Sequence, residues 1–580
     1  MRASIAAALC LAAIGCSKAG PAPRLDSVEP TECFRDDTCG LVLRGSFEAP
    51  LTAALDDPER SALRGFRIQL VSGDLVVDLP DGAFRGPREV DTALPAGAVP
   101  EGLYGIRISD MGGSAELPDA LRVRSTPFVS VGIARAPPIP QFTINSDYGL
   151  DTAAALWGGA VAFDASPSTD TQTAPPDLKI SWSFTLPTSA PPWPDWTVDW
   201  TSGKTASHAF TTVGLETVVL AVKDADGDIG YAARTLSVAN SLQEICVVNS
   251  GTDRDDGALD CAGNSGPDGV LSIDEAVRLS QSPARTETIV LIPPTPGTPM
   301  PLTGGPLTVD SVLYIVGTAG VTIQREIIAQ NSPVTLIGVE VAGPNGKLTV
   351  PNGTTLKLLD STIRDAPGIE VDDGHLAVER TRFERCIGAC IIMNGPYQAA
   401  DLTVSHSSFS GGGSGYGIDA QQCVWNGGSR SLDLISNTFS GFDTAIRVGA
   451  GCVRPTRVVH QTFHGNAVGI DYLGGSQHEL LNNIFTGHSQ SAILGCAVSF
   501  ATGRRKDHLL YGNASDGCIG SDPETLRADP KYVSAADGDF RLRYESPAVD
   551  RAAPTGLDVN GAAPGDYQGS GPDLGGRETY

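Results

Sequence analysis

Residues 402–411 and 432–441 read LTVSHSSFSG and LDLISNTFSG, and the pattern returns as TRVVHQTFHG at 456–465 and HELLNNIFTG at 478–487. Each segment places a phenylalanine behind a short apolar stretch, with a small or polar residue two positions before it. A pattern that returns every 20 to 30 residues is typical of a solenoid. This repeat decides the fold of the C-terminal half.

Two apolar anchors mark every turn of the repeat. The first anchors are Val341, Ile363, Phe383, Phe409, Phe439, Phe463 and Phe485; the second, six to nine residues later, are Ile369, Ile391, Ile418, Ile446, Ile470 and Ile493. The small or polar residues before the first anchors are Ser361, Thr381, Ser407, Asn437, Gln461 and Asn483. One coil cannot bury its own apolar face, so successive coils must stack.

Other repeat folds fit this pattern less well. Leucine-rich repeats need a Leu-x-x-Leu-x-Leu frame, which is missing here, and helical repeats contain far fewer glycines and threonines. The sequence therefore predicts a right-handed parallel β-helix over 331–498. We expect Phe to stack on Phe and Ile on Ile inside it.

The composition of the whole chain agrees with a mainly β protein. The 580 residues include 67 Gly and 41 Pro, and 41% are hydrophobic, which is too apolar for a disordered chain and too punctuated for a helical one. The net charge of 41 − 67 = −26 excludes the basic footprint of a nucleic-acid-binding protein.

The N-terminus has the pattern of an export signal. One Arg precedes an apolar run, and residues 13–16 read Ala-Ile-Gly-Cys. This segment resembles a bacterial lipobox, which implies a lipoprotein signal peptide at 1–15, lipidation of Cys16 and a short tether at 16–24. The resemblance implies a lipid anchor in the outer membrane of a Gram-negative bacterium, at the cell surface.

The cysteines of the exported part fall as neighbours in the sequence. The pairs are Cys33/Cys39, Cys246/Cys261, Cys386/Cys390, Cys423/Cys452 and Cys496/Cys518. An even number of cysteines in an exported chain predicts disulfides, and pairing of neighbours is the simplest of many connectivities. Zinc would need Cys-x-x-Cys pairs or nearby histidines, which do not occur.

Two β-sandwich modules are predicted before the solenoid. Brief apolar stretches alternate with turns over 25–126, where 27–30 (Ser-Val-Glu-Pro) and 102–104 (Gly-Leu-Tyr) resemble an IPT/TIG immunoglobulin-like module. The segment 127–240 resembles a PKD domain through 161–168 (VAFDASPS) and 181–184 (SWSF). Both resemblances imply spacer or binding modules of surface proteins.

Two further resemblances frame the solenoid. Residues 241–330, with Ser272 and Glu275 as a predicted helix capping box, resemble a CSLREAI-type segment that caps right-handed β-helices. Residues 499–580, ending in Pro-Asp-Leu-Gly-Gly-Arg-Glu at 572–578, resemble the choice-of-anchor C-terminal region of bacterial surface β-helix proteins.

Three clusters are candidates for functional sites. Asp372 and Asp373 beside His375 offer the paired carboxylates that pectinase-like hydrolases use, but Asp and Gly are also ordinary turn residues, and we favour a turn. The histidines His460, His464, His478 and His488 are candidates for a sugar-binding groove, although we favour exposed turns. Asp224, Asp226 and Asp228 alternate as in calcium loops, so calcium is the one cofactor that the sequence suggests.

The sequence favours a non-catalytic surface lipoprotein in which sandwich spacers present a β-helix to a polysaccharide, a surface glycan or a protein. One alternative is a polysaccharide lyase or hydrolase on the pectin-lyase-like fold, and another is a purely structural envelope spacer. Fold alone does not separate them. A coil face that gathers carboxylates and basic residues favours chemistry, whereas one with only Ser, Thr, Asn and Gly favours binding or structure.

Overall fold

A computed structural model gives the fold and divides the chain into two compact units, Met1–Gly132 and Ile133–Tyr580. The structure describes residues 22–29, 32–34, 39–47, 51–52, 62–63, 66–73, 75–80, 82–100, 102–110, 113–124, 137–146, 148–170, 173–184, 200, 203–241, 244–251, 257, 261, 269–281, 287–295, 298–395, 401–423, 432–449, 456–474, 478–495, 500–519, 524–557, 559 and 571–576. The predicted lipidation at Cys16 lies outside these residues.

The first unit contains an immunoglobulin-like β-sandwich. One sheet has the order β1 (Arg24–Glu29), β3 (Cys39–Ser46), β9 (Glu89–Leu94) and β8 (Ala83–Gly86); the other has β2 (Glu32–Phe34), β11 (Gly113–Arg124), β10 (Gly102–Asp110), β6 (Arg67–Ser72) and β7 (Leu75–Asp78). A short pair joins β4 (Leu51–Thr52) and β5 (Ala62–Leu63). Alternate residues such as Leu41, Leu43 and Ile68 form its buried core.

A second sandwich opens the other unit. Its sheets have the orders β13 (Gly149–Leu150), β12 (Thr143–Ser146), β15 (Ala160–Asp164), β17 (Thr205–Ala209), and β14 (Ala154–Leu156), β19 (Ile229–Ala239), β18 (Gly214–Lys223), β16 (Lys179–Ser183). Two sandwiches thus precede the repeat region, as the sequence predicted.

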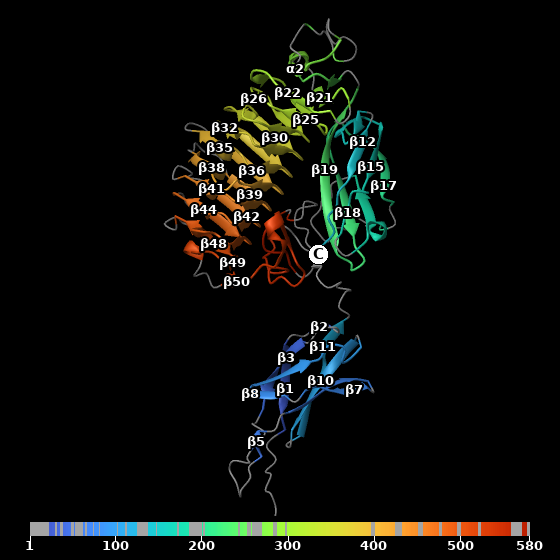
Figure 1. The fold of residues 1–580 in the computed structure, drawn as a ribbon, viewed down its shortest axis with the longest axis vertical. Helices are drawn as coiled ribbons and strands as arrows, with labels where there is room; N and C mark the ends of the chain where they lie inside the picture. Colours follow the sequence, from blue (N-terminus) through green and yellow to red (C-terminus); the bar gives the residue numbers. More distant parts are fainter. Residues whose placement is uncertain are drawn as a thin grey trace, which may run out of the picture. The chain divides into compact units, whose positions relative to one another are not determined.

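A parallel β-solenoid follows (Figure 1). Sheet I contains β20 (Ile245–Val248), β21 (Glu287–Leu291), β24 (Leu313–Val316), β27 (Val334–Ile337), β30 (Thr355–Leu359), β33 (His375–Glu379), β36 (Asp401–Ser405), β39 (Leu432–Ile435), β42 (Thr456–Val459), β45 (His478–Leu481) and β48 (Phe500–Lys506). Sheet II contains β22 (Met300–Leu302), β25 (Val321–Ile323), β28 (Glu340–Ala342), β31 (Thr362–Arg364), β34 (Arg382–Glu384), β37 (Ser408–Ser410), β40 (Thr438–Ser440), β43 (Thr462–His464), β46 (Ile484–Thr486), β49 (Leu509–Tyr511) and β50 (Leu526–Arg527). Sheet III contains β23 (Leu307–Val309), β26 (Glu326–Ala329), β29 (Lys347–Val350), β32 (Gly368–Val371), β35 (Ala389–Gly395), β38 (Tyr416–Cys423), β41 (Thr444–Val448), β44 (Val468–Tyr472) and β47 (Ser491–Leu494).

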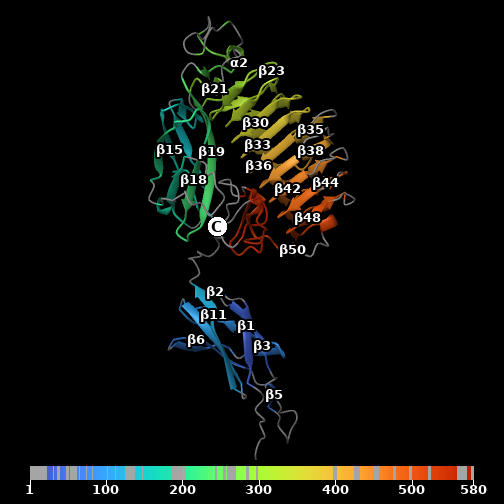
Figure 2. The same cartoon turned by 180° about the vertical axis from the view of Figure 1, so that it is seen from behind.

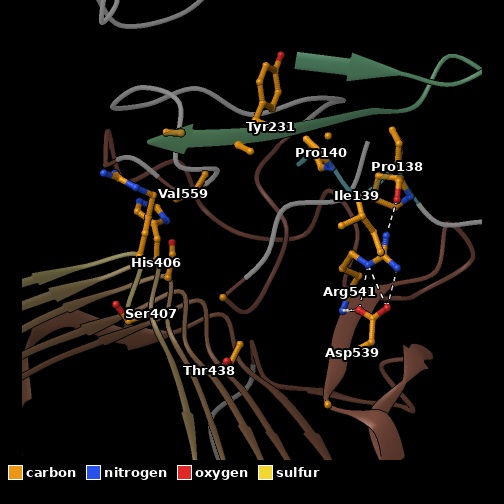
Figure 3. A pocket seen from close by; sticks show the side chains of 18 of the residues that line it. Pro138, Ile139, Pro140, Tyr231, His406, Ser407, Thr438, Asp539, Arg541 and Val559 are labelled. Carbon is orange, nitrogen blue, oxygen red and sulfur yellow. Dashed lines mark hydrogen bonds and ion pairs between the residues drawn. The ribbon is translucent and has the colours of Figure 1, made fainter. Parts of the chain in front are cut away.

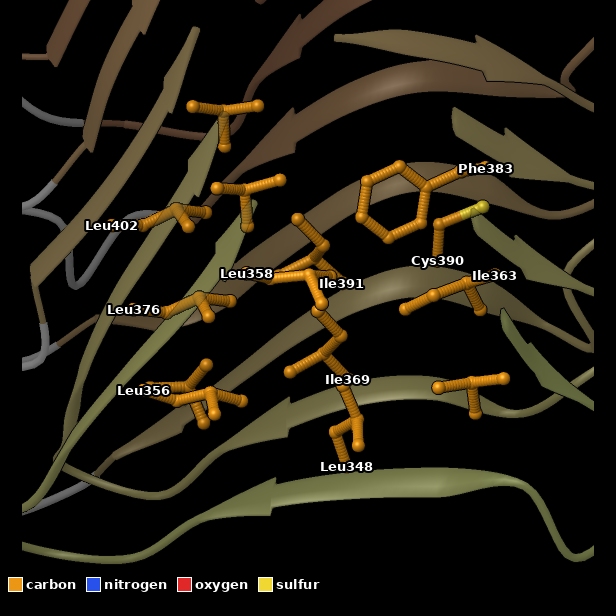
Figure 4. Packing of buried hydrophobic residues seen from close by; sticks show 14 of the residues in the cluster. Leu348, Leu356, Leu358, Ile363, Ile369, Leu376, Phe383, Cys390, Ile391 and Leu402 are labelled. Atoms are coloured by element: carbon orange, nitrogen blue, oxygen red, sulfur yellow. The ribbon is translucent and has the colours of Figure 1, made fainter. Parts of the chain in front are cut away.

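The predicted anchors form columns inside the solenoid. The phenylalanine rings of sheet II stack from Phe383 to Phe485, with centroids 4.4, 4.5, 5.4 and 4.7 Å apart. The second anchors pair in register along sheet III, from Ile369 to Ile493. Ile363, Ile369, Phe383 and Ile391 point into one shared interior (Figure 4). The prediction of Phe on Phe and Ile on Ile is confirmed.

The small and polar positions of the repeat form a second, hydrogen-bonded column. The backbone N–H of Ser407 donates to Asn437 Oδ1 (2.8 Å), that of Asn437 to Gln461 Oε1 (3.2 Å), and that of Gln461 to Asn483 Oδ1 (2.7 Å). The residue before each of them has a positive φ, as at Ser436 (53°) and His460 (54°). This conformation makes the tight corner between sheets I and II.

The second sandwich packs directly against sheet I (Figure 2). Outward-facing Val290, Val316, Ile337 and Leu359 form an apolar stripe that shares a buried cluster with Leu236 and Val238 of the sandwich. Ser237 and Thr288 hydrogen-bond across the contact at 2.9 Å, and Arg380 Nη2 donates to Thr235 Oγ1 at 2.8 Å. The second sandwich is therefore not a separate spacer, in contrast to the expectation from the sequence. Its contact with sheet I removes the apolar stripe from water, which is favourable.

The first coils and the outside of sheet II are also covered. Helix α2 (Ile273–Ser280) begins with the predicted capping box between Ser272 and Glu275. The hairpin β51 (Tyr532–Ser534) and β52 (Asp539–Leu542) and the last described segment lie on sheet II, where Gly575 N donates to Asn482 O (2.8 Å). A Cβ atom on residue 576 would clash with the carbonyl oxygen of Asn437, which explains why Gly occupies this position.

Three predicted cysteine pairs are disulfides: Cys33–Cys39, Cys246–Cys261 and Cys386–Cys390. The predicted Cys423–Cys452 pair stays a prediction, because Cys452 and the side chain of Cys423 lie outside the described residues. Across the part of the chain that the structure describes, no helix is long and apolar enough to cross a membrane.

The fifth predicted pair, Cys496–Cys518, needs a correction at Cys518. The structure has Cys518 as a half-buried thiol rather than as half of a disulfide. It lies in the short 3₁₀ helix η4 (Gly517–Ile519), where its side chain packs against the apolar interior at the end of the solenoid. Cys496 lies outside the described residues. Cysteine behaves as a small hydrophobic residue when it packs against a core, so nearness in the sequence was not sufficient to predict a bridge here.

Candidate functional site on the outer face of sheet III

Charged residues gather on the outside of sheet III. Successive residues of a strand point to opposite sides, so the residue after each buried second anchor faces outward. The sheet III face is defined here as Glu326, Lys347, Glu370, Asp372, Asn394, Tyr416, Asp419, Gln421, Arg447 and Asp471. Five of these side chains are acidic and two are basic, so the face is acidic.

The first half of the sheet III face is organised around Lys347. Its ammonium lies 3.7 Å from Glu326 and forms an ion pair with Glu370, which also accepts a 2.8 Å hydrogen bond from Asn394 Nδ2. The hydrogen bond from Lys347 lowers the pKa of Glu370. Partial burial and then the negative charge of Glu370 raise the pKa of nearby Asp372. Two carboxyls on one face thus have pKa values shifted in opposite directions.

The second half is organised around Arg447. Its guanidinium donates to both carboxylate oxygens of Asp419 (3.0 and 2.5 Å) and to Tyr416 Oη (2.7 Å), and it lies 3.8 Å above the Tyr416 ring. Arg447 pairs in register with Asp471 on the next strand. Partial burial raises the pKa of Asp471, although Arg447 acts in the opposite direction. Arg447 therefore fixes the positions of the Tyr416 ring and the Asp419 carboxylate.

The structure separates the predicted catalytic residues. Asp372 lies with Glu370, whereas Asp373 adopts a φ of 57° in the turn before β33, and its carbonyl accepts from Gly353 N at 3.3 Å. His375 Nδ1 lies 3.2 Å from Asp401 Oδ2, on sheet I. The segment is the turn that its Asp and Gly residues favoured. Only Asp372 belongs to the sheet III face.

The predicted calcium ligands close the hairpin between β18 and β19. Asp224 Oδ1 accepts from Asp228 N at 2.7 Å, and both residues are buried while Asp226 is exposed. Burial and then the charge of Asp228 raise the pKa of Asp224 to about 6. No group of three or more His, Cys, Asp or Glu among the described residues is arranged to hold a metal ion. The alternating spacing therefore does not produce the expected cluster.

Three of the four predicted histidines are buried, which corrects the expectation of exposed turns; the fourth, His464, is half-buried and its Nδ1 lies 2.9 Å from Thr486 Oγ1. His460, His478 and His488 are at most 1% exposed. Burial lowers the pKa of His460 and of His488 to about 4 each. His460 Nδ1 hydrogen-bonds to Asp573 O at 3.1 Å and its Nε2 to Asn482 Nδ2 at 2.8 Å. These rings support the fold and do not form a groove.

A simple signal in the sequence would have found the sheet III face. Glu370, Asp419, Arg447 and Asp471 each directly follow a predicted second anchor. Because alternation sends the residue after an inward anchor outward, these positions share one face once the coils stack. Tyr416 lies two residues before its anchor, Ile418, and depends on the observed register.

Comparisons with known proteins return only distant similarities. No family model matches the chain, and no curated protein matches it. Among solved structures, it is similar to the fibronectin(III)-like modules of Clostridium thermocellum CbhA (9% identity over 37% of this chain and 93% of that one, TM-score 0.17). It is also similar to the titin domains z1z2 in complex with telethonin (14% identity over 38% of this chain and 96% of that one, TM-score 0.17). A third similar structure is the Ig1-2 module of Drosophila receptor protein tyrosine phosphatase DLAR (11% identity over 38% of this chain and 100% of that one, TM-score 0.13).

These TM-scores are too low to support any argument about function. The fold therefore follows from the strand order and register described above. The chain is a mainly β protein in which immunoglobulin-like sandwiches precede a parallel β-solenoid.

Proposed function

We propose that this chain is a cell-surface binding protein that holds a neutral glycan on the sheet III face. The observation that carries this proposal is the set of polar side chains that contacts between coils hold in place near Tyr416. Lys347 pairs with Glu370, which accepts from Asn394, and Arg447 contacts Asp419 and Tyr416. Aromatic rings with a polar edge combine apolar contact area and hydrogen bonding, which suits sugars. The excess of carboxylates on this face disfavours acidic polysaccharides.

The solenoid offers a matched control for this proposal. Arg457 pairs with Asp433 on sheet I much as Arg447 pairs with Asp419 on sheet III, and all four side chains are 17–19% exposed. The two arginines lie on β42 and β41, in consecutive strands of the chain. Loss of either ion pair is therefore expected to disturb the fold to a similar extent.

Binding of neutral and acidic polysaccharides to the full exported chain tests the proposal. We expect Tyr416→Ala and Arg447→Met to weaken binding of a neutral glycan by about tenfold each, while Arg457→Met leaves it unchanged. Equal loss in Arg447→Met and Arg457→Met, or preference for a polyuronate over the neutral glycan, contradicts the proposal.

A polysaccharide-degrading enzyme is the second candidate, favoured by one observation. Glu370 and Asp372 lie on the same face with pKa values shifted apart, which is the arrangement that separates a base or nucleophile from an acid. The gathering of carboxylates with Lys347 and Arg447 also agrees with chemistry. However, Lys347 and Arg447 are both engaged in ion pairs within the face, so we rank binding first.

The enzyme candidate has its own test. New reducing ends or unsaturated products, lost in Asp372→Asn and in Glu370→Gln, would make the protein an enzyme. Binding without product in the same assay supports the non-catalytic proposal. A chain that neither binds nor cleaves any polysaccharide supports the structural envelope spacer.

Anchoring at the outer membrane is part of the proposal and rests on the lipobox resemblance around Cys16. We expect labelled palmitate to be incorporated into the expressed protein and to be lost in Cys16→Ala. The membrane fraction should lose the protein in the same variant. A Cys16→Ala protein that stays in the outer-membrane fraction contradicts lipid anchoring.

A further inference from the structure

A cavity of about 510 Å³ lies beside the proline segment 137–140 (Figure 3). Its Arg541 donates to Pro137 O at 2.5 Å and to Asp539 at 2.9 and 2.6 Å, so this guanidinium is engaged within the protein. Such contacts hold the walls of the cavity together and select no ligand. A different feature, the Asn–Gly pairs of the solenoid, offers chemistry instead.

Three Asn–Gly pairs occur among the residues that the structure describes, and all three lie in sheet III or next to it. Asn345–Gly346 and Asn352–Gly353 flank β29, and Asn394–Gly395 lies at the end of β35. Asparagine before glycine is prone to a spontaneous reaction. Glycine has no side chain to shield its peptide nitrogen or to restrict its backbone, so this nitrogen can reach the asparagine side chain.

The reaction begins when the glycine nitrogen, having lost its proton to hydroxide, attacks the side-chain carbonyl carbon Cγ of the asparagine. A C–N bond forms, the amide nitrogen takes up a proton and leaves as ammonia, and a five-membered succinimide ring results. Water then opens one of the two C–N bonds of the ring, which gives aspartate or isoaspartate. The product carries one more negative charge than the asparagine.

The two pairs beside β29 share the tripeptide Pro-Asn-Gly, at 344–346 and 351–353, and both asparagines are exposed. The surroundings of their glycines differ. Gly346 is buried, and a Cβ there would clash with backbone atoms of Ala342, whereas a Cβ on Gly353 would meet open space. The Gly346 peptide therefore has no room to turn toward the amide before it, whereas the Gly353 peptide has.

The hydrogen bonds of the two glycine nitrogens differ in the same direction. Gly346 N donates to Gly343 O at 3.0 Å and closes a tight turn. Gly353 N donates to Asp373 O at 3.3 Å, which is longer than the usual range for N–H···O bonds. The attacking nitrogen must give up its hydrogen bond, so the longer bond is the easier one to break.

The third pair is held in place by the sheet. Asn394 and Gly395 pair in register with Gln422 and Cys423 of β38. The Asn394 side-chain amide also donates to Glu370 at 2.8 Å. Attack on this amide requires both contacts to break, so the strand protects it.

We propose that Asn352 is a site of spontaneous modification, at which a carboxylate replaces the neutral amide. The turn that contains it lies against the turn of Asp372 and Asp373, through the 2.8 Å bond from Asp372 N to Val350 O. The new charge therefore appears beside the acidic first half of the sheet III face, and an aged chain differs there from a newly made one. The proposal does not depend on the proposed function.

The test incubates the full exported chain in mildly alkaline and in mildly acidic buffer. Peptide mass spectrometry and isoaspartate methyltransferase labelling then measure the product at each asparagine. We expect Asn352 to convert at least about tenfold faster than Asn345 and Asn394, because a weaker hydrogen bond and an uncrowded peptide distinguish it. The rate should rise with hydroxide concentration, since the attacking nitrogen must lose its proton. Equal conversion of Asn345 and Asn352 in the folded chain overturns the proposal.

The same chain unfolded in urea is the control for local sequence. Asn345 and Asn352 lie in identical tripeptides, so their rates should become similar when the fold is lost. Conversion of Asn352 in urea but not in the folded chain overturns the proposal, because the fold would then protect this site as well. Asn352→Gln keeps an amide that reacts much more slowly and should remove most of the isoaspartate of the folded chain. An unchanged yield in that variant also overturns the proposal.

Discussion

The inside of sheet II and the outside of sheet III belong to the same coils and follow opposite rules. Inside, the same residue type returns in coil after coil, so that Phe409 and Phe439 stack with their rings 4.5 Å apart. Outside, the residue type changes at each coil, from Asp419 to Arg447 to Asp471. Close packing favours apolar side chains of similar shape in successive coils, whereas an outer face can place opposite charges on successive coils.

The inner columns therefore provide most of the stability, and the outer face provides the specificity for a ligand. An inner side chain loses dozens of packing contacts when it is cut back. An outer ion pair in contact with water contributes little to stability, yet it fixes where a ligand meets charge. The comparison leads to four predictions, from the largest expected effect to the smallest.

Acidification should destabilise the solenoid most. His460, His488 and His508 are buried and neutral, and burial lowers their pKa values to about 4, about 4 and about 3. The unfolded chain binds these protons near pH 6.5, so stability is complete above that pH and is lost as pH falls toward the folded pKa values. Between the folded and unfolded pKa values, each histidine should lower the free energy of unfolding by about 1.4 kcal/mol for each pH unit of acidification.

Urea unfolding of the full chain at several pH values checks this. The unfolding midpoint should fall steadily below about pH 6.5. His460→Asn should reduce the slope of that fall, because one proton-binding group is removed. A midpoint that is constant down to about pH 5 would contradict the burial of these rings.

Phe439→Ala should be the most damaging single core substitution. It leaves a cavity between Phe409 and Phe463 in the middle of the column, where the side chain is fully buried. The expected loss is about 3–5 kcal/mol in the free energy of unfolding. Thermal or urea unfolding measures it, with Phe439→Leu as a control that should lose much less; equal losses would show that the ring stack is not closely packed.

Asn437→Ala should have an intermediate effect. The Asn437 side chain accepts from Ser407 N and donates to Val404 O at 2.9 Å, so its removal leaves two buried backbone groups unpaired. The expected loss is about 1–3 kcal/mol in the free energy of unfolding. Hydrogen exchange should show the Ser407 amide opening faster, and unchanged exchange there would refute the role of this column.

Arg364→Met should have the smallest effect on stability. Arg364 and Glu340 form an ion pair between coils on the outside of sheet II, with side chains 45% and 31% exposed. The expected loss is below about 1 kcal/mol and should shrink in high salt. A loss as large as that of Asn437→Ala would show that the outer pairs hold the coils together.

The solenoid could be predicted from the sequence because its buried positions recur at a regular spacing. The anchors, the polar column and the capping box at Ser272 were all visible in a single chain, since each obeys a local rule of spacing. Predictions about sites were weaker. Asp224, Asp226 and Asp228 have the spacing of ligands, but a hairpin buries two of these residues and exposes the third. Cys518 has the spacing of a disulfide partner, but its thiol packs against the end of the solenoid core.

The variable lengths of the loops between coils explain why the sheet III face was not predicted from the sequence. Asp419 and Arg447 are 28 residues apart, and the separation of Arg447 and Asp471 is 24. Only the stacked strands bring these side chains into register. Similarly, the burial of His460 depends on Asp573, which returns 113 residues later in the chain.

The sequence by itself determined the mainly β composition, the two sandwiches and the coils with their inner anchors, because apolar side chains must leave water wherever they occur. Only the tertiary structure decided that the second sandwich covers the stripe of Val316 and Ile337 and that His460, His478 and His488 are buried. Those outcomes depend on surfaces from distant segments meeting. Contacts between distant segments cannot be inferred from the spacing of residues within one segment.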